Sequence, residues 1–161
     1  MKILLAIDGS PHSQAAIDEV AQRDWPTGTE IEVLTVIHTK WPMVADPVFF
    51  VAAAHAESLN EQRQDGPTLL DRAVEQIRTG TTALTITAKT LEGVPHEVIV
   101  REAEDLGADL IVLGSHGYGP IRRAILGSVA AAVAVEAPCA VEIIRSQRPP
   151  VKATESRSVA L

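Results

Sequence analysis

Apolar residues fall along the chain in short blocks, separated by segments with a different periodicity. Residues 2–8 (KILLAID) and 109–114 (DLIVLG) are almost wholly apolar, which is typical of strands buried on both faces of a sheet. Residues 29–38 are rich in β-branched side chains, residues 83–93 alternate between apolar and polar, and residues 139–145 form another short apolar run. The pattern therefore predicts five strands.

Helical spacing fills most of the intervals between these strands. Ser10 is placed to cap a helix in which Pro11 takes the first position, and the apolar stripe that follows predicts a helix to about residue 24. A second helix is expected to begin near Pro95 and to end just before Gly107. The alanine-rich residues 128–137 predict a third helix before the last strand.

The interval between the second and third strands is less regular. Residues 39–50 contain two prolines and predict a loop, and the residues after them favour one helical arm with a kink or break at Gly66–Pro67. Residues 146–161 lack periodicity, so we expect a flexible C-terminal tail after a single domain of residues 1–145.

The alternation of strands with helices predicts an α/β fold, namely an open, doubly wound, five-stranded parallel sheet with helices on both faces. Of the 161 residues, 46% are hydrophobic and 22% are charged, which is typical of a globular domain. The formal net charge of −7 argues against a nucleic-acid partner, because nucleic-acid binding needs a basic face.

Three further features bear on the environment of the protein. No apolar stretch approaches the roughly 20 residues that span a bilayer. The apolar run at the N-terminus is too short for a signal peptide, so we expect a cytoplasmic protein with no membrane contact. Cys139 is the one cysteine, which excludes an intrachain disulfide, and its apolar surroundings predict a buried small side chain.

Candidate chemistry lies after the first and fourth strands. In a doubly wound sheet, ligands bind beyond the carboxyl ends of strands, where the strand order reverses. Residues 8–10 (DGS) and 114–128 (GSHGYGPIRRAILGS) occupy such positions. Gly127 has no Cβ to keep a ligand from the backbone, Ser128 adds a hydroxyl, and the first amides of the next helix are free. This combination predicts a phosphate site, although no P-loop, dinucleotide or nucleophile-elbow motif fits the chain.

The glycines of the second segment carry a family resemblance. Gly114, Gly117, Gly127 and Ser128 follow the pattern Gly, two residues, Gly, nine residues, Gly-Ser. Together with ILLAIDGS near the start and EGVPHEVIVREAEDLGADLIVLGSHG in the second half, this pattern resembles the universal stress proteins, specifically their ATP-binding branch, over roughly residues 1–145. The resemblance implies the strand order 3-2-1-4-5, which would bring the carboxyl ends of the first and fourth strands together.

The resemblance also implies which residues contact ATP. Asp8 would meet the adenosine moiety, and Val36 would line the adenine slot near the end of the second strand. The other implied contacts are Ala6 and Ile7 beside that slot, Leu113, Gly114, His116 and Gly117 around the ribose and first phosphate, and Gly127, Ser128 and Val129 at the distal phosphates. Any Mg²⁺ would be held largely by the phosphates. Ala130 stands where some ATP-binding members have a hydroxyl residue, so one side-chain phosphate contact is missing.

The residues leave other interpretations open. Asp8 also fits a local cap at the start of a helix, and His116 also fits a solvated loop residue. No Asp, Glu or Lys lies between Gly114 and Ser128, so dedicated ATP turnover would lack a base and a carboxylate for the metal.

We therefore expect a regulatory stress-response protein that binds an adenine nucleotide, with ATP, AMP or a cyclic nucleotide as ligand. A slow ATP hydrolase or adenylyl-handling enzyme is one alternative, and a structural dimer that binds no nucleotide is another. The resemblance and the short apolar edge at Cys139–Ile144 predict a homodimer joined through the fifth strand.

Overall fold

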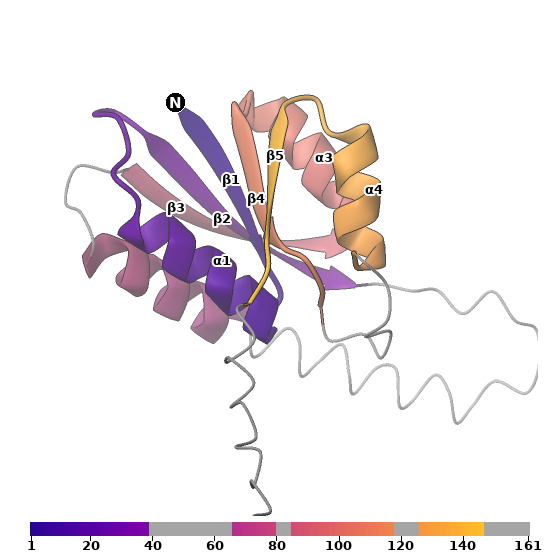
Figure 1. Cartoon of the computed structure of the whole chain (residues 1–161), viewed down its shortest axis with the longest axis horizontal. Helices are drawn as coiled ribbons and strands as arrows, with labels where there is room; N and C mark the ends of the chain where they lie inside the picture. The colour runs from indigo at the N-terminus through magenta and orange to yellow at the C-terminus, as the bar shows by residue number, and fades with distance from the viewer. Residues whose placement is uncertain (39–65, 80–84, 118–125, 147–161) are drawn as a thin grey trace, which may run out of the picture.

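The computed structural model describes residues 1–38, 66–79, 85–117 and 126–146. They build a five-stranded parallel sheet of order β3-β2-β1-β4-β5 (Figure 1). The strands are β1 (Lys2–Ile7), β2 (Glu30–His38), β3 (Thr85–Gly93), β4 (Leu110–Gly114) and β5 (Ala140–Ile144). Both the predicted fold class and the predicted strand order are confirmed.

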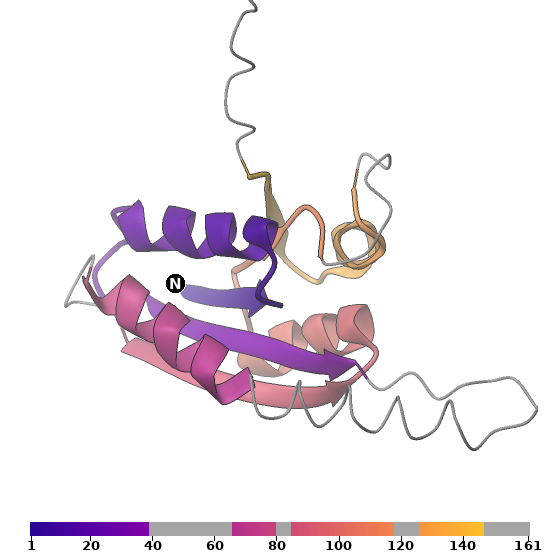
Figure 2. The ribbon, with the colours of Figure 1, turned by 90° about the horizontal axis from the view of Figure 1, so that it is seen from below.

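Helices cover both faces of this sheet. They are α1 (Pro11–Gln22), α3 (Pro95–Leu106), α4 (Ser128–Glu136) and a helix of residues 66–79. The helix of residues 66–79 and α1 lie on one face, and α3 and α4 lie on the other (Figures 1 and 2). Alternate residues of β1 pack into the two layers, with Ile3 and Leu5 on the α1 face and Leu4 and Ala6 on the α3 face. This burial on both sides explains why residues 2–8 are apolar without alternation.

The ends of the helices follow local signals in the sequence. Ser10 caps α1, since its Oγ accepts a hydrogen bond of 3.2 Å from the Ser13 amide, and Pro11 takes the first helical position. The helix ends at Gln22 rather than near residue 24, because the backbone becomes extended at Arg23. α3 ends at Leu106, just before Gly107 as predicted, and Gly107 adopts the left-handed conformation with φ of 65°.

The described part of this helix runs over residues 66–79, so the predicted kink or break at Gly66–Pro67 falls at the edge of the described range and stays a prediction. Leu70, Ala73 and Ile77 are buried along its inner side against the α1 face of the sheet. The predicted loop at 39–50, the earlier half of the predicted helical arm and the tail beyond Ser146 lie outside the described residues.

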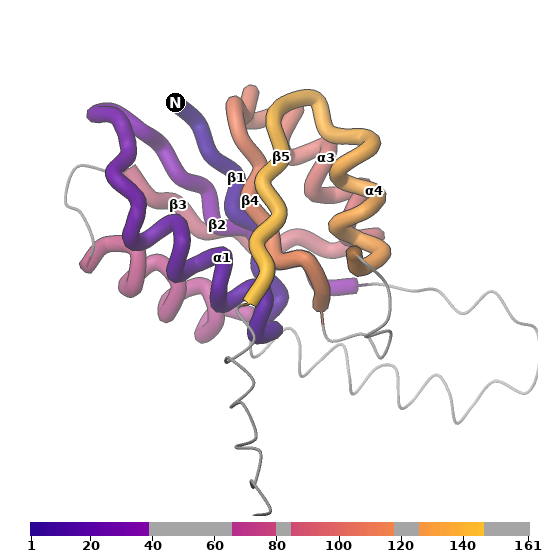
Figure 3. The backbone as a smooth tube through the Cα atoms, in the orientation of Figure 1, coloured from indigo at the N-terminus to yellow at the C-terminus, as the bar shows by residue number. Residues whose placement is uncertain are grey.

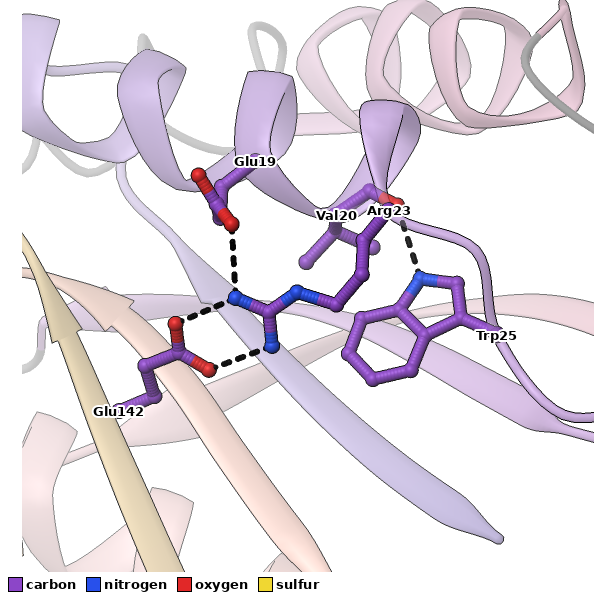
Figure 4. A network of polar contacts seen from close by, with 5 residues as sticks. All are labelled: Glu19, Val20, Arg23, Trp25 and Glu142. Carbon is purple, nitrogen blue, oxygen red and sulfur yellow. Dashed lines mark hydrogen bonds and ion pairs between the residues drawn. The ribbon is translucent and has the colours of Figure 1, made fainter.

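A charged cluster joins the edge strand β5 to the carboxyl-terminal end of α1 (Figure 4). The Arg23 guanidinium donates hydrogen bonds of 2.6 and 2.8 Å to the two carboxylate oxygens of Glu142, and it donates another of 2.7 Å to Glu19. Its Cζ also lies 4.9 Å from the centre of the Trp25 ring, whose Nε1 donates to the Val20 carbonyl. The hydrogen bonds from Arg23 lower the pKa of Glu142. This cluster fixes one face of β5, which runs along the edge of the sheet beside β4 (Figure 3).

Cys139, just before β5, is only half-buried, so the prediction of a buried small side chain is wrong for this residue. Edge strands receive less cover than central ones, and Cys139 lies at the periphery of the α3/α4 layer. Partial burial still raises the pKa of its thiol. Within the described ranges, the helices are too short or too polar to cross a membrane.

Candidate functional site

The carboxyl ends of β1 and β4 lie side by side at the centre of the sheet. Ala6 of β1 pairs with Leu113 of β4, so the chain leaves both strands at the same edge. A Cβ placed on Gly117 would lie 2.5 Å from Asp8 Oδ2, which puts the Asp8 carboxylate directly against the Gly117 backbone. The two segments that the sequence singled out therefore meet.

The turn from β1 into α1 fixes the position of Asp8. Gly9 adopts a positive φ of 81°, and Asp8 Oδ1 accepts a hydrogen bond of 2.9 Å from the Ser10 amide. The Asp8 amide donates to Ser13 Oγ at 3.1 Å, while Ser10 Oγ donates to the His116 carbonyl at 3.2 Å. Asp8 Oδ1 thus closes the turn that precedes α1, whose cap is Ser10, and the exposed Asp8 side chain directs Oδ2 toward Gly117.

Two glycines of the motif make room for the protein's own backbone. A Cβ on Gly114 would lie 2.7 Å from the carbonyl carbon of His12 and from the Ser13 amide, so the end of β4 presses against the first turn of α1. A Cβ on Gly127 would lie 3.2 Å from His116 Cα and from the Ser115 carbonyl oxygen. On the side where a Cβ would stand, Gly127 therefore faces nearby loop backbone, and its predicted contact with a ligand stays a prediction.

The first turn of α4 holds unused donors. The Gly127 amide donates to the Ser115 carbonyl at 2.8 Å, so this amide is engaged within the protein. The first hydrogen bond of the helix runs from the Ala131 amide to the Gly127 carbonyl, and no described side chain caps this end. The amides of Ser128 and Val129 come before that first bond and lack helical acceptors. Ala130 is buried with 2% of its surface exposed, so the position that carries a hydroxyl in some ATP-binding members belongs here to the core.

A groove of about 220 Å³ opens beside these amides, between the amino-terminal ends of α3 and α4. Its lining residues are His38, Val94, Pro95, His96, Ser128, Val129 and Ala132. Only Ser128 and Val129 were predicted from the sequence. Ala132 lies one turn further along α4, and the others come from the end of β2 and the start of α3. The general rule that strand ends meet at one edge could have pointed to these last residues. A wider hollow of about 570 Å³ lies along the single helix of residues 66–79, away from these strand ends.

The remaining predicted residues divide between the two faces of the sheet. Ala6, Val36 and Leu113 pack in the α3/α4 layer beneath the groove. Ile7 packs in the opposite layer, so its side chain points away from the groove. The family resemblance implied both Ala6 and Ile7 beside the adenine slot, but successive strand residues face opposite sides of the sheet.

A cluster of polar side chains lies behind the loop of residues 114–117. The buried Ser115 hydroxyl is 3.1 Å from His12 Nδ1 and 3.2 Å from His116 Nδ1, and the two imidazole centres are 5.2 Å apart. The Ser146 amide, just after β5, donates to His12 Nδ1 at 3.1 Å. His12 and Ser146 were missed because the contacts join positions more than 100 residues apart. The described residues hold no group of three or more His, Cys, Asp or Glu side chains placed to bind a metal ion.

A second buried polar group lies away from these strand ends, between β2, β3 and α3. Lys89 Nζ donates to Glu102 Oε1 at 2.6 Å, and Glu102 is almost fully buried. Oε1 of the neighbouring Glu32 is buried without a hydrogen-bond partner. Burial, together with the Glu102 carboxylate, raises the pKa of Glu32.

Comparisons with known proteins agree with this geometry. The family model described as "Universal stress protein family" matches residues 1–145. A universal stress protein of Thermus aquaticus, encoded in the 3′ region of a QAH/OAS sulfhydrylase, is 34% identical over 147 residues, which cover 89% of this chain and 97% of the relative. Universal stress protein UspA from Lactobacillus plantarum has a similar structure, with a TM-score of 0.73, 27% identity and coverage of 90% of this chain and 97% of that chain.

Two structural neighbours contain nucleotides. A universal stress protein in complex with cAMP gives a TM-score of 0.65 at 22% identity, over 91% of this chain and 98% of the other. A family protein from Arabidopsis thaliana with AMP bound gives 0.64 at 21% identity, over 91% of this chain and 92% of the other. The family match along residues 1–145, together with the shared strand order, shows that this chain belongs to the universal stress protein family.

Proposed function

We propose that this protein binds an adenine nucleotide, with ATP as the expected ligand, at the carboxyl ends of β1 and β4. The observation that carries the proposal is the placement of the Asp8 carboxylate against Gly117, at the same edge as the uncapped first turn of α4 and the groove beside it. The neighbours with bound cAMP and AMP support the same class of ligand.

Each part of the edge suits one part of a nucleotide. The exposed Asp8 carboxylate accepts hydrogen bonds, as ribose hydroxyls require. The amides of Ser128 and Val129, with the Ser128 hydroxyl, form the positive end of a helix and suit phosphate oxygens. Val94, Pro95 and Val129 give the groove apolar walls for a base. In this proposal Gly127 positions the loop and contributes no amide, and any Mg²⁺ is held by the phosphates.

We infer a regulatory role rather than dedicated catalysis. The stretch from Gly114 to Ser128 contains no Asp, Glu or Lys, so it supplies no general base and no carboxylate ligand for a metal. Nucleotide occupancy would then act through changes in the contacts that the protein makes.

The direct test is thermal unfolding with and without ATP, AMP and cAMP. Ligand at 100 times its dissociation constant should add about 2.7 kcal/mol of stability, which corresponds to roughly 5–10 °C for a domain of this size. Asp8→Asn should reduce the shift, whereas the matched change Asp24→Asn, at an exposed carboxylate far from the strand ends, should leave it intact. No shift with any of the three nucleotides would overturn the proposal, and mass analysis of the purified protein should identify a copurifying nucleotide.

We also propose that a second copy of the chain docks at the edge of β5. The strand lies at one end of the sheet with β4 as its only described neighbour. Beside it on α4, Val135 is 85% exposed, the most exposed large apolar residue among those described. Light scattering should therefore give a dimer mass, and Val135→Asp should lower the dimer fraction. A wild-type protein that stays monomeric at micromolar concentration would contradict this part.

A further inference from the structure

The Ser115 hydroxyl lies between two imidazoles that belong to different parts of the site. His12 Nδ1, on the first turn of α1, is 3.1 Å away, and His116 Nδ1, on the loop after β4, is 3.2 Å away. Ser115 is 0% exposed, so water does not compete for its hydroxyl. A hydroxyl carries one proton, so Ser115 can donate to only one of these nitrogens at a time.

His12 Nδ1 is also within hydrogen-bond distance of Ser146, just after β5. The Ser146 amide donates to it at 3.1 Å, and Ser146 Oγ lies 3.2 Å away. A backbone amide can only donate, so His12 Nδ1 must accept and therefore carries no proton. This nitrogen has one lone pair in the plane of the ring. The Ser115 hydroxyl and the Ser146 amide consequently compete for the same acceptor.

The rest of Ser115 is fixed, which leaves its hydroxyl as the adjustable group. The Ser115 amide donates to the Ile144 carbonyl at 2.7 Å, and the Ser115 carbonyl accepts from the Gly127 amide at 2.8 Å. The next residue, His116, is held through its carbonyl by Ser10 Oγ. A ligand against residues 116–117 therefore acts on the His116 ring next to a Ser115 backbone that stays in place.

We propose that His12 is a positioning residue that couples the loop of residues 114–117 to Ser146 at the end of β5. In one state His116 Nδ1 carries no proton and accepts from the Ser115 hydroxyl, and His12 Nδ1 accepts from the Ser146 amide. In the other state the hydroxyl donates to His12, and the Ser146 amide loses its acceptor. The change from the first state to the second rests on the proposed function, because it is triggered by a bound nucleotide that draws the His116 ring away from Ser115. Such coupling is reciprocal: the factor by which a nucleotide weakens the hydrogen bond between His12 and the Ser146 amide is also the factor by which that bond lowers nucleotide affinity.

The first experiment needs no nucleotide and measures hydrogen exchange of the Ser146 amide by NMR. His12→Ala should speed this exchange about fivefold, the usual effect of losing one hydrogen bond. His12→Asn keeps an acceptor oxygen and should restore part of the protection. Ser115→Ala removes the competitor and should slow the exchange, which a purely structural role for Ser115 would not produce. Gln14→Ala, an exposed change on the same helix whose side chain bonds Asp18 and Gln76, serves as control. Unchanged or faster exchange in Ser115→Ala would overturn the competition.

The second experiment repeats the measurement with saturating Mg-ATP. In the wild type the Ser146 amide should exchange faster with ATP, and His12→Ala should abolish this response and alter ATP affinity by about fivefold. If ATP binds and the Ser146 amide does not respond, the coupling is wrong while the proposed function stands. If the wild type binds none of ATP, AMP and cAMP, the proposed function fails, and the nucleotide-free variants still decide whether His12 positions Ser146.

Discussion

Gly114 and Gly117 stand three residues apart on one loop, and replacing each with alanine should have opposite consequences. At Gly114 a new Cβ would lie 2.7 to 2.9 Å from three backbone atoms of His12 and Ser13. At Gly117 the near contact is instead the end of a side chain, with Asp8 Oδ2 at 2.5 Å. Neither glycine has a positive φ, so alanine fits both backbones and the difference lies in what each methyl group meets.

Gly114→Ala should therefore lower stability. Backbone atoms in the first turn of α1 cannot rotate away, so β4 and α1 must separate by a few tenths of an ångström. Such overpacking costs about 1–3 kcal/mol, and the melting temperature should fall by roughly 2–12 °C.

Gly117→Ala should leave the melting temperature of the nucleotide-free protein almost unchanged, because the exposed Asp8 carboxylate can turn aside. The same movement takes Asp8 away from the proposed nucleotide. Losing a hydrogen bond to a charged group costs about 1.5–3 kcal/mol, so affinity for ATP should fall about tenfold to a hundredfold.

Thermal melts and titration calorimetry on the two variants separate these effects. A Gly114→Ala protein that melts with the wild type would refute the close contact between β4 and α1. A Gly117→Ala protein that keeps wild-type ATP affinity would refute the role of Asp8, even if ATP binds elsewhere at this edge.

The other predictions concern the ion pair between Arg23 and Glu142, the buried carboxyl groups of Glu32 and Glu102, and the Ser10 cap of α1. Glu142→Gln removes the paired contact with Arg23 and should cost about 1 kcal/mol; the loss, followed in thermal melts, should shrink in high salt, and a salt-independent loss would point to packing instead. The pKa of Glu32 is higher in the folded protein than in the unfolded chain. Its contribution to stability is therefore complete at pH values below the unfolded-state pKa, and it is lost as the pH rises through the folded-state pKa. Glu32→Gln should therefore melt above the wild type at neutral pH and match it in acid, with Glu102 and Lys89 unchanged beside it; equal melting temperatures at every pH would contradict the shift. Ser10→Ala should cost about 1 kcal/mol through the lost cap of α1, and Ser10→Thr should restore most of it in the same melts.

Local signals in the sequence determined the elements of this fold and where several of them begin and end. The apolar runs at residues 2–8 and 109–114 predict central strands, because only a strand covered on both faces can lack polar positions. Ser10–Pro11 and Gly107 mark helix ends through hydrogen bonds and backbone angles that involve only neighbouring residues. The glycine-serine pattern then identified the family, and with it the strand order that places the two candidate segments together.

The tertiary structure decided what each residue of the site faces. Gly114 and Gly127 make room for backbone of α1 and of the loop, and Ile7 points away from the groove although its neighbour Ala6 does not. The groove itself gathers residues from β2, α3 and α4, and the bond between Ser115 and His12 joins positions 103 residues apart. Periodicity reports only which side of its own element a residue occupies. The atoms that fill the space opposite are set by packing between elements that are distant in the chain, so they emerge only when the sheet and its helices are assembled.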